Sequence, residues 1–187
     1  LPSLGEAGVE QFVLADLVRG HSYSIKDAES VARIKGDLRM AKIVVNAVGD
    51  RQRALRKDVE IGFGAGYLRL TSSESATIVR EARRRFRRHN AAHRFVETEV
   101  ISAMIASSRN PDADVDTLRD SLRDIPEFRA TLARIWPMLV PSELLHDLFG
   151  SAALVKSAAK DEFSAEEYGC LVRARSNTVA EVLWSDS

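Results

Sequence analysis

Asp58-Val-Glu-Ile-Gly-Phe-Gly-Ala-Gly-Tyr-Leu-Arg-Leu70 is the stretch of this chain where the helical periodicity of the sequence stops. From Val59 to Phe63 apolar side chains occupy every second position, which is the period of a β-strand. The glycines that follow can take the positive φ angles of a tight turn, and Tyr67 to Leu70 form a second short apolar run. The stretch therefore predicts a β-hairpin.

A helical pattern precedes the hairpin. Apolar residues recur at intervals of three and four between Asp27 and about Arg53, which predicts one long helix with Asp27 as its N-cap. Gly36 and Gly49 each weaken the helix interior by roughly 1 kcal/mol relative to alanine, which leaves room for a bend or an early end. The residues expected to form the apolar stripe are Val31, Ile34, Leu38, Ala41, Val45 and Val48.

Several helices are expected after the hairpin. Thr71-Ser-Ser-Glu74 supplies hydroxyl groups for an N-cap, and a second helix is expected from about Arg94, with Asn90 at the junction. The predicted fold class is mainly α, with one β-hairpin and short terminal strands. Further helices are predicted at 115–122, 127–135, 142–156 and, after a capping-box sequence, 164–174, and short strands at 9–14 and 179–184.

Length and composition are those of an ordinary globular protein. The chain has 187 residues, 45% hydrophobic and 29% charged, with a net charge of zero, which suits one domain or two small subdomains. The single cysteine, Cys170, excludes an internal disulfide, fits a reducing cytoplasm and is interpreted as a core thiol. No apolar run approaches the roughly 20 residues that span a bilayer, so no membrane partner is expected. The chain starts without Met, and we expect it to be an internal piece of a larger protein.

The strongest local signal is basic. Between Arg80 and Arg94 there are seven arginines and one glutamate, which gives a local net charge of +6. Guanidinium groups suit phosphates, and five phosphate contacts would give a salt dependence of binding with a slope of about −4.5. A solvated helix face, a nucleic-acid contact and a contact with an acidic protein surface are the three interpretations that stay open. On a helix, the arginines that would share one face, opposite Ile78, Ala82 and Phe86, are Arg80, Arg83, Arg84, Arg87 and Arg88.

The second signal is acidic, in the loop from Arg109 to Asp116 and the helix that follows it. The Asp-x-Asp-x-Asp spacing resembles the start of a calcium loop, but Thr117 and Arg123 replace the glycine and glutamate that such a loop requires. The loop is interpreted as a solvated helix start or as a mimic of nucleic-acid charge against a basic partner. Its candidate partner-binding residues are Asp112, Asp114 and Asp116.

No catalytic constellation is found in the sequence. His89 and His93 have metal-ligand spacing, but the arginines around them would repel a cation. The glycines from Gly62 to Gly66 lack the Lys-Ser/Thr pair and the following helix of a phosphate loop. We therefore expect no metal, no cofactor and no catalysis in this chain by itself. A small hydrolase that uses Cys170 or a histidine is the weakest alternative.

Several stretches together resemble the UvrD-like superfamily 1 helicases of the HelD/HelR type, which are helicase-like ATPases that remove and recycle RNA polymerase. The stretches spread over most of the chain, and none of them is a catalytic signature. They are Leu1-Pro-Ser-Leu-Gly-Glu, Arg51-Gln-Arg with Phe63-Gly-Ala-Gly, Arg83-Arg-Arg-Phe-Arg-Arg-His-Asn, and Leu144-Leu-His-Asp-Leu-Phe-Gly-Ser.

The resemblance implies a division of the chain into three parts. Residues 1–26 would flank the insertion as a piece of the motor domain, residues 27–160 would be the helical insertion, and residues 161–187 would return to the motor domain. Such an insertion enters the DNA channel of core RNA polymerase and opens the clamp, which releases nucleic acid. The resemblance assigns ATP and magnesium to a longer parent chain, because no Walker A or B motif is present here, and implies a cytoplasmic, nucleoid-associated location.

The charged segments would then contact the polymerase. The acidic loop would compete with nucleic acid for basic channel walls, and the arginine face would bind acidic clamp elements or DNA. The alternative is a DNA-binding accessory domain of an ATP-dependent DNA helicase, in which the arginines from Arg80 to Arg88 follow a phosphate backbone.

Overall fold

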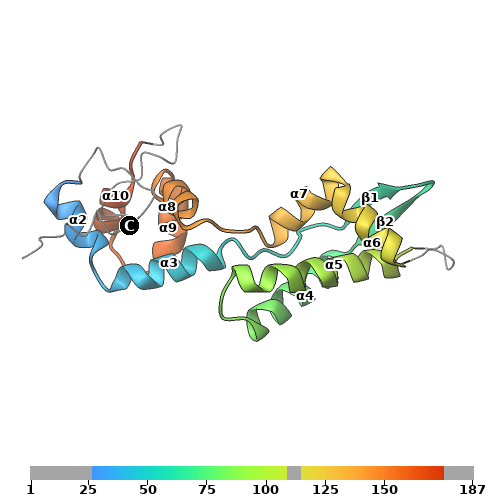
Figure 1. Cartoon of the computed structure of the whole chain (residues 1–187). Helices are drawn as coiled ribbons and strands as arrows, with labels where there is room; N and C mark the ends of the chain where they lie inside the picture. The colour runs from blue at the N-terminus through green and yellow to red at the C-terminus, as the bar shows by residue number, and fades with distance from the viewer. Residues whose placement is uncertain (1–26, 109–114, 175–187) are drawn as a thin grey trace, which may run out of the picture.

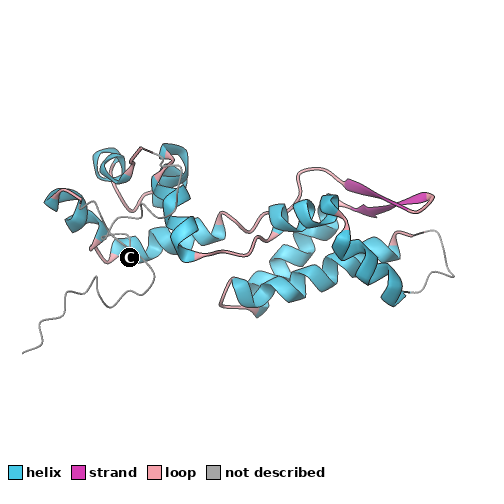
Figure 2. Ribbon diagram, turned by 45° about the horizontal axis from the view of Figure 1, so that its top comes forward, coloured by secondary structure: helices cyan, strands magenta, loops and turns pink. Residues whose placement is uncertain are grey.

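The structure, a computed structural model, describes residues 27–108 and 115–174. Within these ranges the chain is mainly helical and contains one two-stranded antiparallel hairpin, which confirms the predicted fold class for this part of the chain. The helices form two lobes that lie end to end, so that the molecule is elongated (Figure 1 and Figure 2). The strands predicted at 9–14 and 179–184 fall outside the described residues.

One lobe, which we call the hairpin lobe, is formed by a continuous stretch of chain. Its hydrophobic core uses buried residues from Ile61 to Trp136. The lobe contains β1 (Val59–Phe63), β2 (Gly66–Leu70), α4 (Ser72–Arg85), the short 3₁₀ helix η1 (Asn90–Ala92), α5 (His93–Ala106), α6 (Val115–Asp124) and α7 (Pro126–Ile135).

The hairpin has the alternating pattern that its sequence predicts. Ile61 of β1 pairs with Leu68 of β2, and both side chains are buried against the helices. Gly64 has a φ of 57°, a conformation that glycine adopts without steric cost, so the turn forms where the glycine run predicts it. The opposite face of the hairpin is open to solvent, and Tyr67 on it is 73% exposed.

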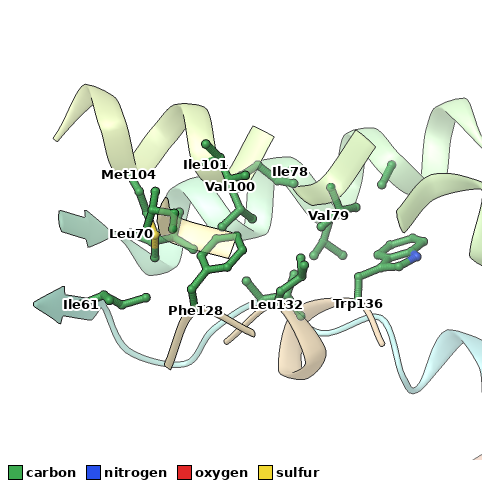
Figure 3. Packing of buried hydrophobic residues seen from close by; sticks show 14 of the residues in the cluster. Ile61, Leu70, Ile78, Val79, Val100, Ile101, Met104, Phe128, Leu132 and Trp136 are labelled. Atoms are coloured by element: carbon green, nitrogen blue, oxygen red, sulfur yellow. The ribbon is translucent and has the colours of Figure 1, made fainter. Parts of the chain in front are cut away.

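Helix α5 is central to the hairpin lobe, because it packs against β2, α4, α6 and α7. Val100, Ile101 and Met104 of α5 are fully buried. Phe128 and Leu132 of α7 point toward this layer of helices (Figure 3). Each such apolar side chain contributes about 1.5–3 kcal/mol when it is removed from water, so this packing fixes the hairpin on the helices.

The other lobe, which we call the α3 lobe, is assembled from two separate stretches of chain. Its core is a second hydrophobic cluster that includes Ile43, Phe149 and Val155. Phe163 and Leu171 belong to the same cluster, so residues beyond 160 pack with those before it. The lobe contains α2 (Glu29–Lys35), α3 (Arg39–Gly49), α8 (Pro141–Phe149), α9 (Ala152–Ala159) and α10 (Ala165–Leu171).

The long helix predicted from Asp27 to Arg53 is wrong as a single element, because it divides into α2 and α3. The break lies at the glycine that sequence analysis marked as a weak point, Gly36. Directly after it, a carboxylate oxygen of Asp37 accepts a hydrogen bond from the backbone N–H of Arg39 at 2.8 Å, which competes with continuation of the helix. Asp27 is not the N-cap either: Ala28 occupies that position, and the carboxylate of Asp27 bonds to Lys35.

The predicted apolar stripe of this region is also wrong for α3. Leu38, just before the helix, is 93% exposed and Val45 is 70% exposed, and Ala41 is exposed as well. The residues of α3 that are buried are Met40, Ile43 and Ala47. The helix therefore turns the opposite side to the core and leaves an apolar side outside.

The helix predicted at 142–156 is likewise two helices, α8 and α9. They are separated at Gly150 and Ser151, where the Ser151 hydroxyl accepts from the backbone N–H of Leu154 at 3.4 Å and so caps α9. The predicted helix starts at Thr71 and Ser164 are confirmed, since each forms a complete capping box with a glutamate three residues later. None of the helices in the described ranges is long and apolar enough to cross a bilayer.

The reversed face of α3 can be tested with two substitutions on the same helix. Ile43→Ala removes a fully buried side chain and is expected to lower the free energy of unfolding by about 2–5 kcal/mol. Val45→Ala changes an exposed position and is expected to alter it by no more than about 0.5 kcal/mol. Urea unfolding followed by circular dichroism measures both, and equal losses would contradict the observed packing.

Candidate partner interface

Two segments connect the lobes, and we call them together the waist: residues 50–58 lead from α3 to β1, and residues 136–140 lead from α7 to α8 (Figure 1). The backbone N–H of Arg53 donates to the carbonyl of Ile135 at 3.0 Å, so the first segment runs beside the end of α7. The backbone N–H of Leu55 donates to the buried hydroxyl of Ser75 at 2.9 Å. The waist is therefore held against both α4 and α7.

His89, between α4 and η1, joins the two segments of the waist. Its Nε2 lies 2.6 Å from the carbonyl oxygen of Pro137, and its Nδ1 lies 3.1 Å from Nε2 of Gln52. The ring also stacks on the indole of Trp136, with centroids 4.9 Å apart and planes 6° from parallel. The Trp136 indole N–H in turn donates to the backbone carbonyl of His89 at 2.9 Å. One residue thus contacts both connecting segments.

The protonation of His89 follows from its neighbours. The side-chain oxygen of Gln52 accepts from Nε of Arg83 at 2.9 Å, so the amide nitrogen of Gln52 faces His89 as a donor. Nδ1 of His89 must then accept, and the proton resides on Nε2, which donates to Pro137. Burial lowers the pKa of His89 below its ordinary value of 6.5, and the nearby His93 lowers it further, while the bond to Pro137 acts in the opposite direction. The neutral ring is the form that fits the waist.

Further hydrogen bonds close the waist. Asn90 donates from its amide nitrogen to the carbonyl of Leu139 at 2.8 Å and accepts from the N–H of Leu139 at 2.9 Å. Arg83 donates to the carbonyl oxygens of Gly49 at 3.0 Å and Gln52 at 2.7 Å. The waist is therefore fixed by a connected polar network as well as by apolar packing.

The arginines predicted to share one helix face do not all lie on a helix. Helix α4 ends at Arg85, because Phe86 adopts an extended conformation and packs its ring 5.5 Å from that of Phe95. Ile78 and Ala82 are buried as predicted. Arg87 and Arg88 consequently belong to the connection between α4 and η1.

The predicted arginines have different roles in the structure. Arg83 supports the waist, and Arg80 donates to the hydroxyl of Thr77 at 3.1 Å. Arg84 pairs with Glu81 at 2.8 Å and lowers the pKa of that carboxyl. Arg87 and Arg88 are exposed and, within the part of the chain that the structure describes, make no side-chain hydrogen bond or ion pair. These last two cations are the members of the set available to a partner.

Most of the acidic candidate residues lie outside the part of the chain that the structure describes. Asp112 and Asp114 lie outside the described residues. Asp116 is in the first turn of α6, but its side chain is not among those described. The role of the acidic loop therefore stays a prediction.

A second basic set was missed by sequence analysis. A pocket of about 750 Å³ lies along the first waist segment and is closed on one side by α7. The sequence does contain four cationic residues within seven positions, from Arg51 to Lys57. They were not singled out because their spacing does not place them on one face of a helix. Asp58 is the carboxylate among the lining residues of the pocket, and that group pairs with Arg69. The cations that line it are Arg51, Arg53, Arg56, Lys57 and Arg134.

The remaining candidates from the sequence are the cysteine, the glycine run and a metal site. Cys170 is exposed on α10, so its interpretation as a core thiol is wrong; Leu171 takes the buried position instead. Gly62 lies in β1 and Gly66 in β2, and Gly64 lies in the turn between the two strands. Among the described residues there is no group of three or more His, Cys, Asp or Glu side chains that could hold a metal such as magnesium.

The structural role of Arg83 gives a test against its neighbour Arg87. Arg83→Ala removes donors to two backbone carbonyls and is expected to lower the free energy of unfolding by about 1 kcal/mol. Arg87→Ala, the matched control, is expected to stay within about 0.5 kcal/mol of the parent protein. Thermal and urea unfolding decide between them, and an equal effect of both would show that Arg83 does not support the waist.

His89 makes stability depend on pH. Above its ordinary pKa of 6.5 both folded and unfolded chains hold a neutral ring, so the contribution of His89 is complete. As the pH falls below 6.5, the unfolded chain binds a proton before the folded chain does, and stability is lost. The stability difference between the parent protein and His89→Gln is therefore expected to shrink between about pH 7 and pH 5. Parallel pH profiles for the parent protein and His89→Gln would exclude this role.

Two comparisons, with protein-family models and with curated proteins, give no match for this chain. The resemblance to helicases of the HelD/HelR type therefore stays a prediction, and function has to be inferred from the residues and their placement.

Proposed function

We propose that this chain is a binding module, the polymerase-engaging insertion of a helicase-like ATPase of the HelD/HelR type. It enters the DNA channel of core RNA polymerase, opens the clamp and so releases nucleic acid. The observation that supports this proposal is the elongated pair of helical lobes with a hydrogen-bonded waist between them. A wedge must transmit force along its length without folding at its middle, and a braced waist meets that requirement.

Charge gives such a wedge its orientation. Complementary charges across an interface set the register and raise the association rate more than they raise affinity. Four exposed cations make no side-chain hydrogen bond or ion pair among the described residues: Arg87 and Arg88 in the connection between α4 and η1, and Arg56 and Lys57 in the other basic set. They are suited to acidic surfaces of the polymerase. The proposal assigns ATP hydrolysis to a motor domain outside this chain, in the cytoplasm at the nucleoid.

The same cations favour a second candidate, a DNA-binding accessory domain of an ATP-dependent DNA helicase. Of the five arginines first considered, Arg83 supports the waist and Arg84 is paired with Glu81. If only Arg87 and Arg88 contacted phosphates, the slope of log affinity against log salt would be about −1.8. Five phosphate contacts would give a slope of about −4.5, so the measured slope tells how many of the arginines contact phosphates.

A titration against core RNA polymerase separates the two candidates. The fluorescently labelled chain is expected to bind saturably, and double-stranded DNA is expected to displace it, because the insertion and DNA would occupy the same channel. Arg87→Glu combined with Arg88→Glu is expected to slow association, with Glu99→Lys as a charge-changing control on the exposed side of α5.

The outcome that would reject the polymerase proposal is equally clear. Absence of polymerase binding, together with DNA binding that weakens with salt and is lost in the double arginine variant, would favour the accessory domain. Polymerase binding that DNA leaves unchanged would place the contact outside the DNA channel.

A further inference from the structure

Helix α3 carries apolar residues on its buried side, at Met40, Ile43 and Ala47, and on its uncovered side as well. Its polar residues all bond to the remainder of the α3 lobe: Arg39 pairs with Glu167 at 2.8 Å, and Lys42 pairs with Glu162 at 3.1 Å. The Asn46 amide donates to the carbonyl of Ala158 at 2.9 Å. A helix of a globular protein normally turns its polar side to solvent. In α3 the polar side chains contact the protein, and an apolar side remains uncovered among the described residues.

The uncovered side of α3 has the spacing of a helix-packing seam. Its residues are separated by three, four and three positions, which is the a/d pattern of a coiled coil. Val45 is 70% exposed and Leu38 is 93% exposed, so most of the surface of these two side chains is in contact with solvent. A second helix is the element that fits such a seam, because its side chains can interdigitate with it. The seam consists of Leu38, Ala41, Val45 and Val48.

The seam continues into a groove at the waist. The groove has a volume of about 1070 Å³ and lies between α3, the connection from Phe86 to Asn90, and the start of α8. Val44, Val45 and Val48 supply part of its apolar surface, and Phe86 and Leu139 add to it from across the groove. The apolar residues therefore continue on more than one wall.

The rim of this groove is strongly basic. Five cationic side chains and a single carboxylate, that of Asp50, are among its lining residues. Arg84 is the one of these cations that has a carboxylate partner in the described structure, Glu81. The other four lack an ion pair there, since Arg83 and Lys160 bond to neutral oxygens. The groove cations without a carboxylate partner are Arg83, Arg87, Arg88 and Lys160.

We propose that this groove and the α3 seam bind an acidic amphipathic helix of a protein partner. Apolar residues of that helix would cover the valines, and its carboxylates would meet the arginine rim. A nucleic-acid backbone would satisfy the arginines but would leave the valines in water, so it fits only half of the surface. The proposal does not depend on RNA polymerase being the partner.

The test uses the full chain and a synthetic probe. A fluorescein-labelled peptide of about 18 residues carries leucines at alternating intervals of three and four and glutamates at most other positions. Its anisotropy on titration is expected to report saturable binding. A peptide of the same composition with scrambled leucine positions is expected to bind at least about tenfold more weakly, because it cannot align its apolar residues with the seam.

Variants of the chain locate the binding surface. Val45→Asp is expected to weaken peptide binding about tenfold or more, because it places a carboxylate in the apolar seam. Arg87→Glu with Arg88→Glu is expected to do the same by reversing the rim charge. Arg56→Glu with Lys57→Glu makes the same charge change at the other basic set and is expected to stay within about twofold. Equal binding of both peptides, or unchanged binding by Val45→Asp, would overturn the proposal.

Other occupants of the groove give different results, each of which overturns the proposal. If a second copy covers the seam, Val45→Asp will convert a dimer to a monomer in sedimentation. If another segment of this chain covers it, Val45→Asp will lower the melting temperature. If the groove binds DNA, a duplex will bind without the peptide doing so, and Val45→Asp will leave duplex binding unchanged. The expected result is that Val45→Asp leaves both the oligomeric state in sedimentation and the melting temperature of the protein unchanged.

Discussion

The arrangement of the two lobes depends on the hydrogen bonds of one neutral imidazole. His89 donates through Nε2 to the second waist segment and accepts through Nδ1 from the first, so its ring requires a donor on one side and an acceptor on the other. Arg83 fixes which way the Gln52 amide faces, and the amide fixes the tautomer of His89. The stacked indole of Trp136 excludes water from one face of the ring. Shape, charge state and the relative position of the lobes are therefore coupled at a single residue.

Local signals in the sequence predicted the elements that local residues determine. The hairpin from Val59 to Leu70 and the capping boxes at Thr71 and Ser164 depend on neighbours within a few positions, and they were found. The break before α3 was anticipated only as a weak point at Gly36. At the break, the backbone N–H of Arg39 donates to the carboxylate of Asp37. This local bond competes with continuation of the helix, and the spacing of apolar residues does not reveal it. The inverted face of α3 could not be read from the sequence. Its polar residues bond to partners more than 100 positions away, so the sequence around α3 gives no local signal for which side of the helix is buried.

In the candidate site, too, the sequence reveals local features but not long-range contacts. Composition identifies a cluster of arginines as the strongest charged feature, but it does not predict which residues each arginine contacts. Arg83 became part of the scaffold because two backbone carbonyls of the waist lie within reach, whereas Arg87 and Arg88 follow the end of α4 and stay exposed. The waist itself joins residues that are distant in the sequence: Gln52 and Arg83 are 31 positions apart, and Asn90 and Leu139 are 49 positions apart. Contacts at that separation follow from tertiary packing, and no pattern in a window of the sequence contains them.

The α3 lobe is built from two stretches of chain that enclose the whole hairpin lobe in sequence, and this order has a consequence for how the protein forms during synthesis. The hairpin lobe can complete its core once residues up to Trp136 have left the ribosome. Helices α2 and α3 are made before the hairpin lobe, yet their core needs Phe149, Val155 and Leu171, which are made after it. Met40 and Ile43 therefore lack these partners until more than 100 further residues have been made. The α3 lobe therefore assembles after the hairpin lobe. The hairpin lobe lies between the two stretches of chain that form the α3 lobe, and its folding shortens the distance between them.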